Sequence, residues 1–213
     1  MGRPAAPPPR GVYLIADAAT RSGEQLVAAV TAALGAGVRL VQYRDKAPLS
    51  DAQLATATAL RQAAHAHGAL FLVNDRVDLV LMCGADGVHL GQDDLPPHVA
   101  RALLPAGALV GISTHNLDEA LAAQRAGADY VGFGNVFGTT SKADALPPTG
   151  TGPLAEACRA LAIPVYAIGG VNGANLAAVK AAGCAGGALI GAVLKADDPG
   201  AAARELGRVW AES

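Results

Sequence analysis

The sequence has few charged residues, few aromatic residues and few cysteines, and these shortages exclude several classes of protein. Charged residues make up 16% and aromatic residues 4% of the 213 residues, whereas apolar residues reach 52%. A chain with this much apolar material is not disordered throughout. The net charge of -2 provides no overall field that would attract nucleic acid or an anionic membrane. We therefore expect neither a nucleic-acid partner nor a membrane partner.

Cysteines and long apolar runs are also scarce. Cys83, Cys158 and Cys184 lie far apart and in no CxxC spacing. The sequence thus predicts neither a disulfide framework nor a zinc site, and we expect reduced core cysteines. No apolar run approaches the roughly 18 residues of a membrane span, and the N-terminus lacks the apolar core of a signal peptide. These absences predict a cytoplasmic protein.

The length predicts one large domain preceded by a short tail. Single hydrophobic cores stop growing only at roughly 250 residues, so 213 residues fit one domain. Residues 1–10 (MGRPAAPPPR) carry four prolines and little to bury, which predicts a disordered tail. Residues 11–213 are predicted to form a single catalytic domain.

The remaining chain alternates short β-branched runs with longer Ala-rich stretches of helical spacing, as repeated βα units do. Eight strands are predicted, over residues 12–17, 38–45, 70–75, 87–91, 109–114, 129–136, 163–170 and 187–193. Helices are predicted between them, among them residues 24–37, 51–68, 117–128, 153–162 and 175–183. A phrase running from helix end through Gly into a strand recurs four times, which indicates a cyclic repeat. The fold class predicted is α/β, a single (β/α)8 TIM barrel, with a doubly wound open sheet as the alternative.

Cationic side chains end the second predicted strand. The two-residue strand period places Gln42, Arg44 and Lys46 on one side and Tyr43 on the other. Helices cover the outside of a parallel barrel, so two cations are expected to line its mouth and to bind an anion. The alternative is a solvated strand end with a surface salt bridge to Asp45.

Carboxylates follow the third and fourth predicted strands, as Asn74-Asp75 and Gln92-Asp93-Asp94. Carboxylates at one rim repel unless a cation lies between them, and Mg²⁺ commonly takes one or two carboxylates plus phosphate oxygens. A magnesium ion bridging to a diphosphate would fit. The alternative is that these residues cap helices, since Asn and Asp are favoured N-caps.

Hydroxyl and glycine residues follow the sixth, seventh and eighth predicted strands. Residues 138–142 (GTTSK) open the longest loop, which is typical of an anion-binding lip or a lid, or of a plain surface loop. Glycines near Gly170 and Gly191 would let backbone N–H groups approach a phosphate where barrels often hold one. No Ser, His and Asp arrangement for nucleophilic catalysis is evident; His89 and His115 remain minor candidates for binding.

Read in order, these motifs resemble the thiamine-phosphate synthase family over nearly the whole chain from Gly11 to Trp210. The phrases that carry the resemblance are YLIAD, VQYRDK, LVNDRVDLVLMCGADGVHLGQDD, VGIST, GFGNVFGTTSK, IPVYAIGG and GALIGA. The resemblance implies a transferase of thiamine biosynthesis that joins hydroxymethylpyrimidine diphosphate to hydroxyethylthiazole phosphate and releases pyrophosphate.

The resemblance also implies roles for residues of this chain. The pyrimidine diphosphate would be held by Gln42, Tyr43, Arg44, Asp45, Lys46, Asn74, Ser113 and Lys142. Of these, Arg44, Lys46, Ser113 and Lys142 would be catalytic, and Asp75 and Asp94 would bind Mg²⁺. The thiazole phosphate would be held by Thr139, Thr140, Ser141, Gly170, Ile190 and Gly191.

This sequence departs from the common family pattern at four positions. Asn135 and Gly138 stand where prolines are usual, Ser141 where Thr is usual and Gly191 where Ser is usual. These departures bear on the thiazole-phosphate residues more than on the magnesium residues. Three other functions are alternatives: a metal-independent thiazole tautomerase of the related barrel family, a non-catalytic protein that binds thiamine intermediates, and another phosphate-binding barrel isomerase. The first is expected to lack the paired carboxylate motifs, and the third would need an acid and base pair that is not evident.

Overall fold

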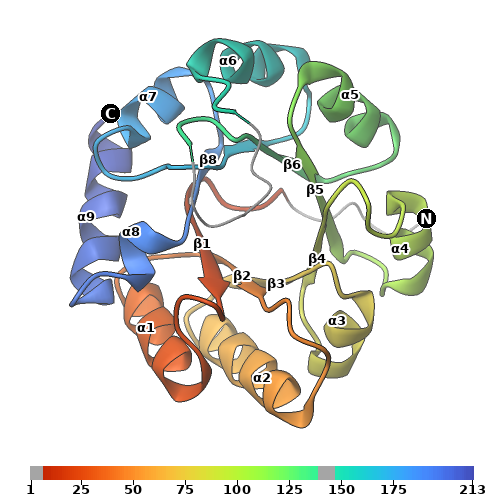
Figure 1. The fold of residues 1–213 in the computed structure, drawn as a ribbon, viewed down its shortest axis with the longest axis vertical. Helices are drawn as coiled ribbons and strands as arrows, with labels where there is room; N and C mark the ends of the chain where they lie inside the picture. Colours follow the sequence, from red (N-terminus) through yellow and green to blue (C-terminus); the bar gives the residue numbers. More distant parts are fainter. Residues whose placement is uncertain (1–6, 139–146) are drawn as a thin grey trace.

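A computed structural model describes residues 7–138 and 147–213, and these form one closed parallel barrel (Figure 1). Its strands are paired in chain order, and β8 returns to pair with β1. The prediction of a (β/α)8 barrel is confirmed, and the open sheet is excluded because the ring is closed. The strands are β1 (Gly11–Asp17), β2 (Leu40–Arg44), β3 (Leu70–Asn74), β4 (Gly87–Leu90), β5 (Leu109–Thr114), β6 (Tyr130–Phe133), β7 (Val165–Ala167) and β8 (Gly186–Leu189).

Helices surround the barrel on its outer side (Figure 1). Within the described residues they are α1 (Gly23–Gly35), α2 (Asp51–Ala66), α3 (Val77–Cys83), α4 (Pro97–Leu103), α5 (Leu117–Arg125), α6 (Thr151–Ala160), α7 (Leu176–Ala181), α8 (Gly191–Leu194) and α9 (Pro199–Glu212). Two of them, α8 and α9, follow the last strand, and α9 packs against α1, α7 and α8. No helix of the described residues is long and apolar enough to cross a membrane.

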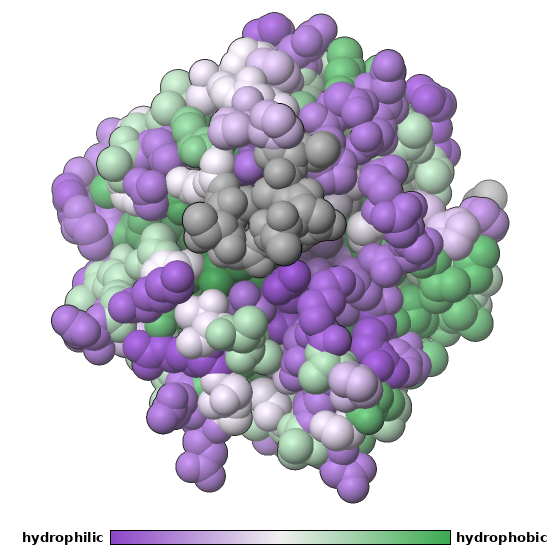
Figure 2. Space-filling model, viewed as in Figure 1, coloured by the Kyte–Doolittle hydropathy of each residue, from purple (hydrophilic) through white to green (hydrophobic). Residues whose placement is uncertain are grey.

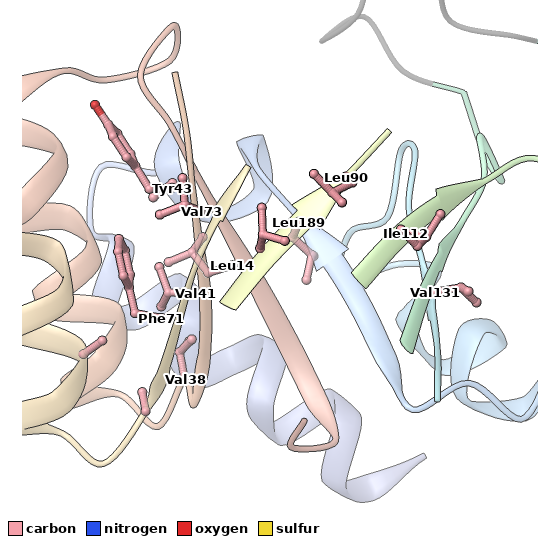
Figure 3. Packing of buried hydrophobic residues seen from close by; sticks show 14 of the residues in the cluster. Leu14, Val38, Val41, Tyr43, Phe71, Val73, Leu90, Ile112, Val131 and Leu189 are labelled. Carbon is pink, nitrogen blue, oxygen red and sulfur yellow. The ribbon is translucent and has the colours of Figure 1, made fainter. Parts of the chain in front are cut away.

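Two apolar layers hold the fold together, one on each side of the strands. Outward-facing residues such as Val41, Tyr43 and Phe71 pack against the helices (Figure 3). Inward-facing residues fill the barrel and include Tyr13, Tyr130 and Tyr166, whose rings meet edge to face with centroids 5.4 to 6.0 Å apart. The two-residue period of each strand therefore sorts side chains between the barrel interior and the helix layer.

Two expectations from the sequence need correction. The predicted strand over residues 187–193 ends at Leu189, and α8 begins at Gly191. A short apolar run reads equally as strand or helix, so its periodicity could not place this boundary. The tail is also shorter than predicted: Pro8 is buried, and the Tyr166 hydroxyl donates to the carbonyls of Pro8 and Pro9, 3.0 and 2.9 Å away. The fold at this end therefore begins before residue 11.

Candidate active site

Polar residues gather where the strands end at their carboxyl termini. On the face seen in Figure 2, hydrophilic side chains cluster near the centre of the molecule, over the ends of β2, β3 and β4. This is the end of the barrel at which TIM-barrel enzymes build their active sites. The residues predicted from the sequence can be placed on it strand by strand.

The end of β2 carries one amide and two cations. Gln42 is buried in the barrel, and its Nε2 donates to the Tyr13 hydroxyl. The Arg44 guanidinium lies 3.1 Å from an Asp17 carboxylate oxygen, and that carboxylate is itself buried. The Lys46 ammonium, which is mostly exposed, pairs with Asp75 at the end of β3. The alternative of a salt bridge to Asp45 is therefore wrong for both cations: Asp45 instead accepts hydrogen bonds from the Tyr43 hydroxyl and the Ala47 N–H.

Two carboxylates meet beside Lys46. Burial raises the pKa of Asp94, and the neighbouring Asp75 raises it further through a hydrogen bond and like charge, while the Gly91 N–H and Lys46 act in the opposite direction. Asp75 has a φ of 62°, a left-handed conformation that is unusual for a non-glycine residue. Two carboxylates this close favour an added cation or a proton between them.

These carboxylates do not cap helices. The N-caps of α3 and α4 are Arg76 and Pro96, and neither makes a side-chain capping hydrogen bond. The Asp94 carboxylate instead accepts from the Gly91 N–H, 2.7 Å away, which closes the turn after β4. The helix-cap alternative is therefore wrong for Asp75 and Asp94, and their side chains face the site.

A chain of hydrogen bonds crosses the barrel interior below these charges. The hydroxyls of Tyr13 and Tyr130 lie 2.8 Å apart, and the Tyr130 hydroxyl lies 2.9 Å from His89 Nδ1. His89 Nε2 in turn lies 2.9 Å from the Ser113 hydroxyl. Gln42, at the start of this chain, and Ser113, at its end, are thereby connected through three buried side chains.

The first hydrogen bond of this chain has a defined direction. An amide NH2 group only donates, so the Tyr13 hydroxyl accepts from Gln42. Either hydroxyl can donate in the bond between Tyr13 and Tyr130, and the tautomer of His89 sets which atoms donate in its bonds to Tyr130 and Ser113. Burial raises the pKa of both tyrosines, so both remain neutral hydroxyls.

The junction between β6 and β7 forms the other half of the rim. Gly170 has a φ of 68°, and a Cβ there would lie 2.2 Å from the Gly138 carbonyl oxygen, so only glycine fits. The Asn135 side-chain oxygen accepts from the Gly138 N–H at 3.0 Å, and the Asn135 backbone carbonyl accepts from the Thr149 N–H at 2.8 Å. Asn135 thus joins the two chain segments that flank residues 139–146.

The remaining predicted residues divide into three groups. Asn74 ends β3 and pairs in register with His89, while Ile190 and Gly191 follow β8 at the start of α8. Tyr43 is not brought together with the others, since its ring lies in the helix layer (Figure 3). Thr139, Thr140, Ser141 and Lys142 lie outside the described residues.

Sequence reasoning missed Asp17, the partner of Arg44, and it gave little weight to Tyr13, Tyr130 and His89. A signal for Asp17 was available, because it is a charged residue at the carboxyl end of the first strand, as Asp75 is near the third. His115, the other minor candidate, lies 2.9 Å from Glu119 through Nδ1, beside the start of α5. Its contact is local.

The side chains at this rim offer few ligands for a metal ion. Across residues 7–138 and 147–213, no group of three or more His, Cys, Asp or Glu side chains is gathered as a complete metal centre. Mg²⁺ does not require one, because it usually keeps several waters and takes one or two carboxylates together with substrate phosphates. The paired carboxylates of Asp75 and Asp94 fit that requirement.

The fold and the site together are those of a TIM-barrel enzyme with cations and two carboxylates at the carboxyl end of the barrel. The thiamine monophosphate synthase family model matches residues 12–193. A thiamine-phosphate synthase of Chloroflexus aurantiacus is 45% identical over 92% of this chain and 90% of its own length. Another, of Synechococcus, is 48% identical over 91% of this chain, which spans about half (55%) of that longer relative. The solved thiamine phosphate pyrophosphorylase of Pyrococcus furiosus superposes with a TM-score of 0.86 at 37% identity, over 95% of this chain and 96% of that one.

The chain belongs to the thiamine-phosphate synthase family. Membership makes it an enzyme of thiamine biosynthesis and confirms the transferase function predicted from the sequence motifs.

Proposed function

We propose that the carboxyl end of this barrel joins hydroxymethylpyrimidine diphosphate to hydroxyethylthiazole phosphate. The thiazole ring nitrogen attacks the methylene carbon of the pyrimidine, the carbon–oxygen bond to the diphosphate breaks, and thiamine phosphate and pyrophosphate leave. The observation that supports this most directly is the grouping of Arg44 and Lys46 with Asp75 and Asp94 around one rim. Cations next to a paired carboxylate site suit a magnesium diphosphate.

In this proposal the protein stabilises the leaving group. The pyrimidine amino group can share the positive charge that develops on the methylene carbon, so little acid or base chemistry is required. Negative charge grows on the departing pyrophosphate, and Arg44, Lys46 and Lys142 would stabilise it. Gln42 and the Ser113 hydroxyl would orient the pyrimidine end from inside the barrel.

We further propose that Asp75 and Asp94 hold Mg²⁺ when the diphosphate binds. The metal would neutralise diphosphate charge that the cations alone leave uncompensated. The raised pKa of Asp94 supports the assignment, because a carboxylate that is destabilised beside another gains most from a divalent cation.

The thiazole phosphate is proposed to bind at the other half of the rim. Gly170 after β7 and Ile190 and Gly191 after β8 present backbone groups there, and Thr139, Thr140 and Ser141 would complete the site. The substrates are small molecules, and a cytoplasmic location remains a prediction.

Pyrophosphate release tests the proposal. We expect release to require both substrates and Mg²⁺, and Asp75→Ala or Asp94→Ala to remove most of it. Asp93→Ala is the matched control, because Asp93 is exposed beside the same turn and should be replaceable without loss. Full turnover after EDTA treatment would contradict the metal assignment. Isomerisation of the thiazole without pyrophosphate release would establish the metal-independent tautomerase.

A second measurement tests the role of the cations. Charge on the leaving group grows toward the transition state, so Arg44→Ala and Lys142→Ala should lower kcat more than they raise KM for the pyrimidine diphosphate. Effects confined to KM in both variants would mean that these residues bind the substrate and its transition state equally.

A further inference from the structure

Two of the three cysteines are in contact at the end of the barrel opposite the active site. Cys158 lies in the last turn of α6, and Cys184 lies just before β8, so the two are 26 positions apart in the chain. Their sulfur atoms are 3.3 Å apart, and both thiols are free. Cys184 is fully buried, while Cys158 is partly exposed to solvent.

The surroundings make these two thiols unequal. Hydrogen bonding to Cys184, together with the positive charges of Arg159 and Arg10, lowers the pKa of Cys158 against the effect of burial. Hydrogen bonding to Cys158 and burial raise the pKa of Cys184. Arg10 is held in place because its guanidinium donates to the Cys184 carbonyl, 3.0 Å away. The accessible sulfur is therefore also the one with more thiolate character, as in reactive cysteine pairs.

We propose that Cys158 and Cys184 form a thiol–disulfide exchange site, which takes a small disulfide such as oxidised glutathione and closes into a reversible intramolecular disulfide. The contact between the sulfurs carries the proposal. A disulfide bond is about 2.05 Å long, so the sulfurs must approach by little more than an ångström.

The exchange takes place in two balanced steps. The Cys158 thiolate attacks one sulfur of oxidised glutathione, forming a mixed disulfide and releasing one glutathione thiolate, which takes up a proton. Cys184 then loses its proton and attacks Cys158 Sγ, which releases the second glutathione. Two protein thiols are oxidised and one glutathione disulfide is reduced to two thiols. The high pKa of Cys184 slows its deprotonation, but its contact with Cys158 gives it a high effective concentration.

A disulfide between Cys158 and Cys184 would link helix α6 covalently to the barrel. The disulfide joins the end of α6 to the chain that enters β8, and it lies at the amino ends of the strands, away from Arg44 and Asp75. Such a bond stabilises a fold mainly by restricting the unfolded chain. In a reducing compartment it would form only transiently, under oxidative conditions.

The test uses the full chain, freed of reductant and incubated with oxidised glutathione. Of the three thiols in the sequence, we expect one to remain by thiol titration of the denatured product. The intact mass should fall by two hydrogens with no glutathione added, and a peptide map without reductant should join the Cys158 and Cys184 peptides. The oxidised protein should melt several degrees higher. Dithiothreitol should restore the three thiols and return the melting temperature to that of the reduced protein.

Single variants separate the two steps. Cys184→Ser lacks the second nucleophile, so it should accumulate a stable glutathione adduct on Cys158. Cys158→Ser should keep Cys184 reduced. Cys83→Ser is the matched control: Cys83 is buried at the end of α3 and burial raises its pKa, so its replacement should leave the disulfide unchanged.

Three results would overturn the proposal. One is a stable glutathione adduct on Cys158 of the unaltered chain with Cys184 still free, which would show a reactive thiol without a partner. Another is a disulfide that involves Cys83 or links two chains. The third is the absence of any thiol loss until the protein is unfolded.

Discussion

The Gly138 N–H donates a hydrogen bond to Asn135 Oδ1, with 3.0 Å between nitrogen and oxygen. These two residues stand where the resemblance to the family predicts prolines, so the two departures occur together and contact each other. Gly138 has a φ of 92°, whereas proline is fixed near −65° and has no N–H to donate. The junction after β6 therefore keeps its shape by a side-chain hydrogen bond and a left-handed glycine instead of by ring geometry.

This junction predicts a specific effect of Gly138→Ala. A residue with a Cβ in a left-handed conformation costs about 1–2 kcal/mol, although the space at Gly138 is sufficient, since the nearest atom is Pro148 Cγ at 3.5 Å. We expect the melting temperature to fall by a few degrees. Because the segment borders the proposed thiazole-phosphate residues, KM for the thiazole phosphate should also rise several-fold.

Gly107→Ala provides the control, because Gly107 has a φ of 88° with nothing within 4 Å of an added Cβ, and it lies before β5, away from the site. It should lower the melting temperature to the same degree and leave both KM values unchanged. Equal KM effects in the two variants would mean that the junction acts only through stability.

Asp94 predicts a pH-dependent gain in stability on substitution. Burial and Asp75 raise the pKa of Asp94 in the folded protein above the ordinary 3.8 of the unfolded chain. At pH values between the unfolded pKa and the raised folded pKa, the folded protein therefore binds more protons than the unfolded chain. Stability therefore falls as pH rises through this window, and the loss is complete above it. Asp94→Asn removes the charge and keeps an acceptor for the Gly91 N–H. The metal-free variant should melt higher than the parent at neutral pH, and the difference should vanish below about pH 3.8.

Differential scanning calorimetry with and without Mg²⁺ checks this prediction. The metal should raise the melting temperature of the parent and barely change that of Asp94→Asn, since a ligand stabilises only the form that binds it. Asp93→Asn should behave as the parent. A lower melting temperature of metal-free Asp94→Asn at neutral pH would show that the carboxylate is stabilising as it stands.

The sequence predicted the barrel because alternating strand and helix patterns are local, and each could be recognised without its neighbours. It could not predict contacts that depend on register. Asp17 and Arg44 are direct partners across β1 and β2, which explains their ion pair, but a single sequence does not reveal which residues lie opposite. The same holds for Gly111, whose missing side chain makes room for the Tyr130 ring, a register partner in β6.

The candidate site was predictable to a similar extent. Strand-end positions identified Arg44, Lys46, Asp75 and Asp94, since side chains at the carboxyl ends of barrel strands meet at one rim. The chain from Gln42 to Ser113 was not predictable, because it joins side chains of five different strands, β1, β2, β4, β5 and β6. The contact of Cys158 with Cys184 was missed for the same reason: distance along the chain says nothing about distance in the fold.

The interior chain predicts that Tyr13→Phe lowers both stability and turnover. Loss of the hydroxyl removes the buried partner of Gln42 Nε2 and one of the two partners of the Tyr130 hydroxyl, which keeps its contact with His89, at a cost of about 1–3 kcal/mol. The hydrogen-bond chain from Gln42 to Ser113 is then broken, so the Ser113 hydroxyl loses its orientation. We expect kcat to fall several-fold, as measured by steady-state pyrophosphate release.

Tyr166→Phe separates the two effects. Tyr166 packs against the same rings, but its hydroxyl donates to Pro8 and Pro9 at the opposite end of the barrel. It should lose stability to a similar degree and keep its kcat. If both variants lost turnover equally, the chain would matter for packing alone.

Gly191→Ser should strengthen binding of the thiazole phosphate. A Cβ at Gly191 would meet the flexible Lys195 side chain at 3.4 Å from Cδ, and Gly191 has no left-handed φ, so the side chain can be added with little strain. The new hydroxyl can donate one hydrogen bond of about 0.5–1.5 kcal/mol, which corresponds to a few-fold lower KM for the thiazole phosphate. The kcat and the KM for the pyrimidine diphosphate should stay nearly unchanged. Steady-state kinetics with each substrate varied in turn measures this, and a raised thiazole KM would show that the phosphate needs the close backbone approach that glycine permits.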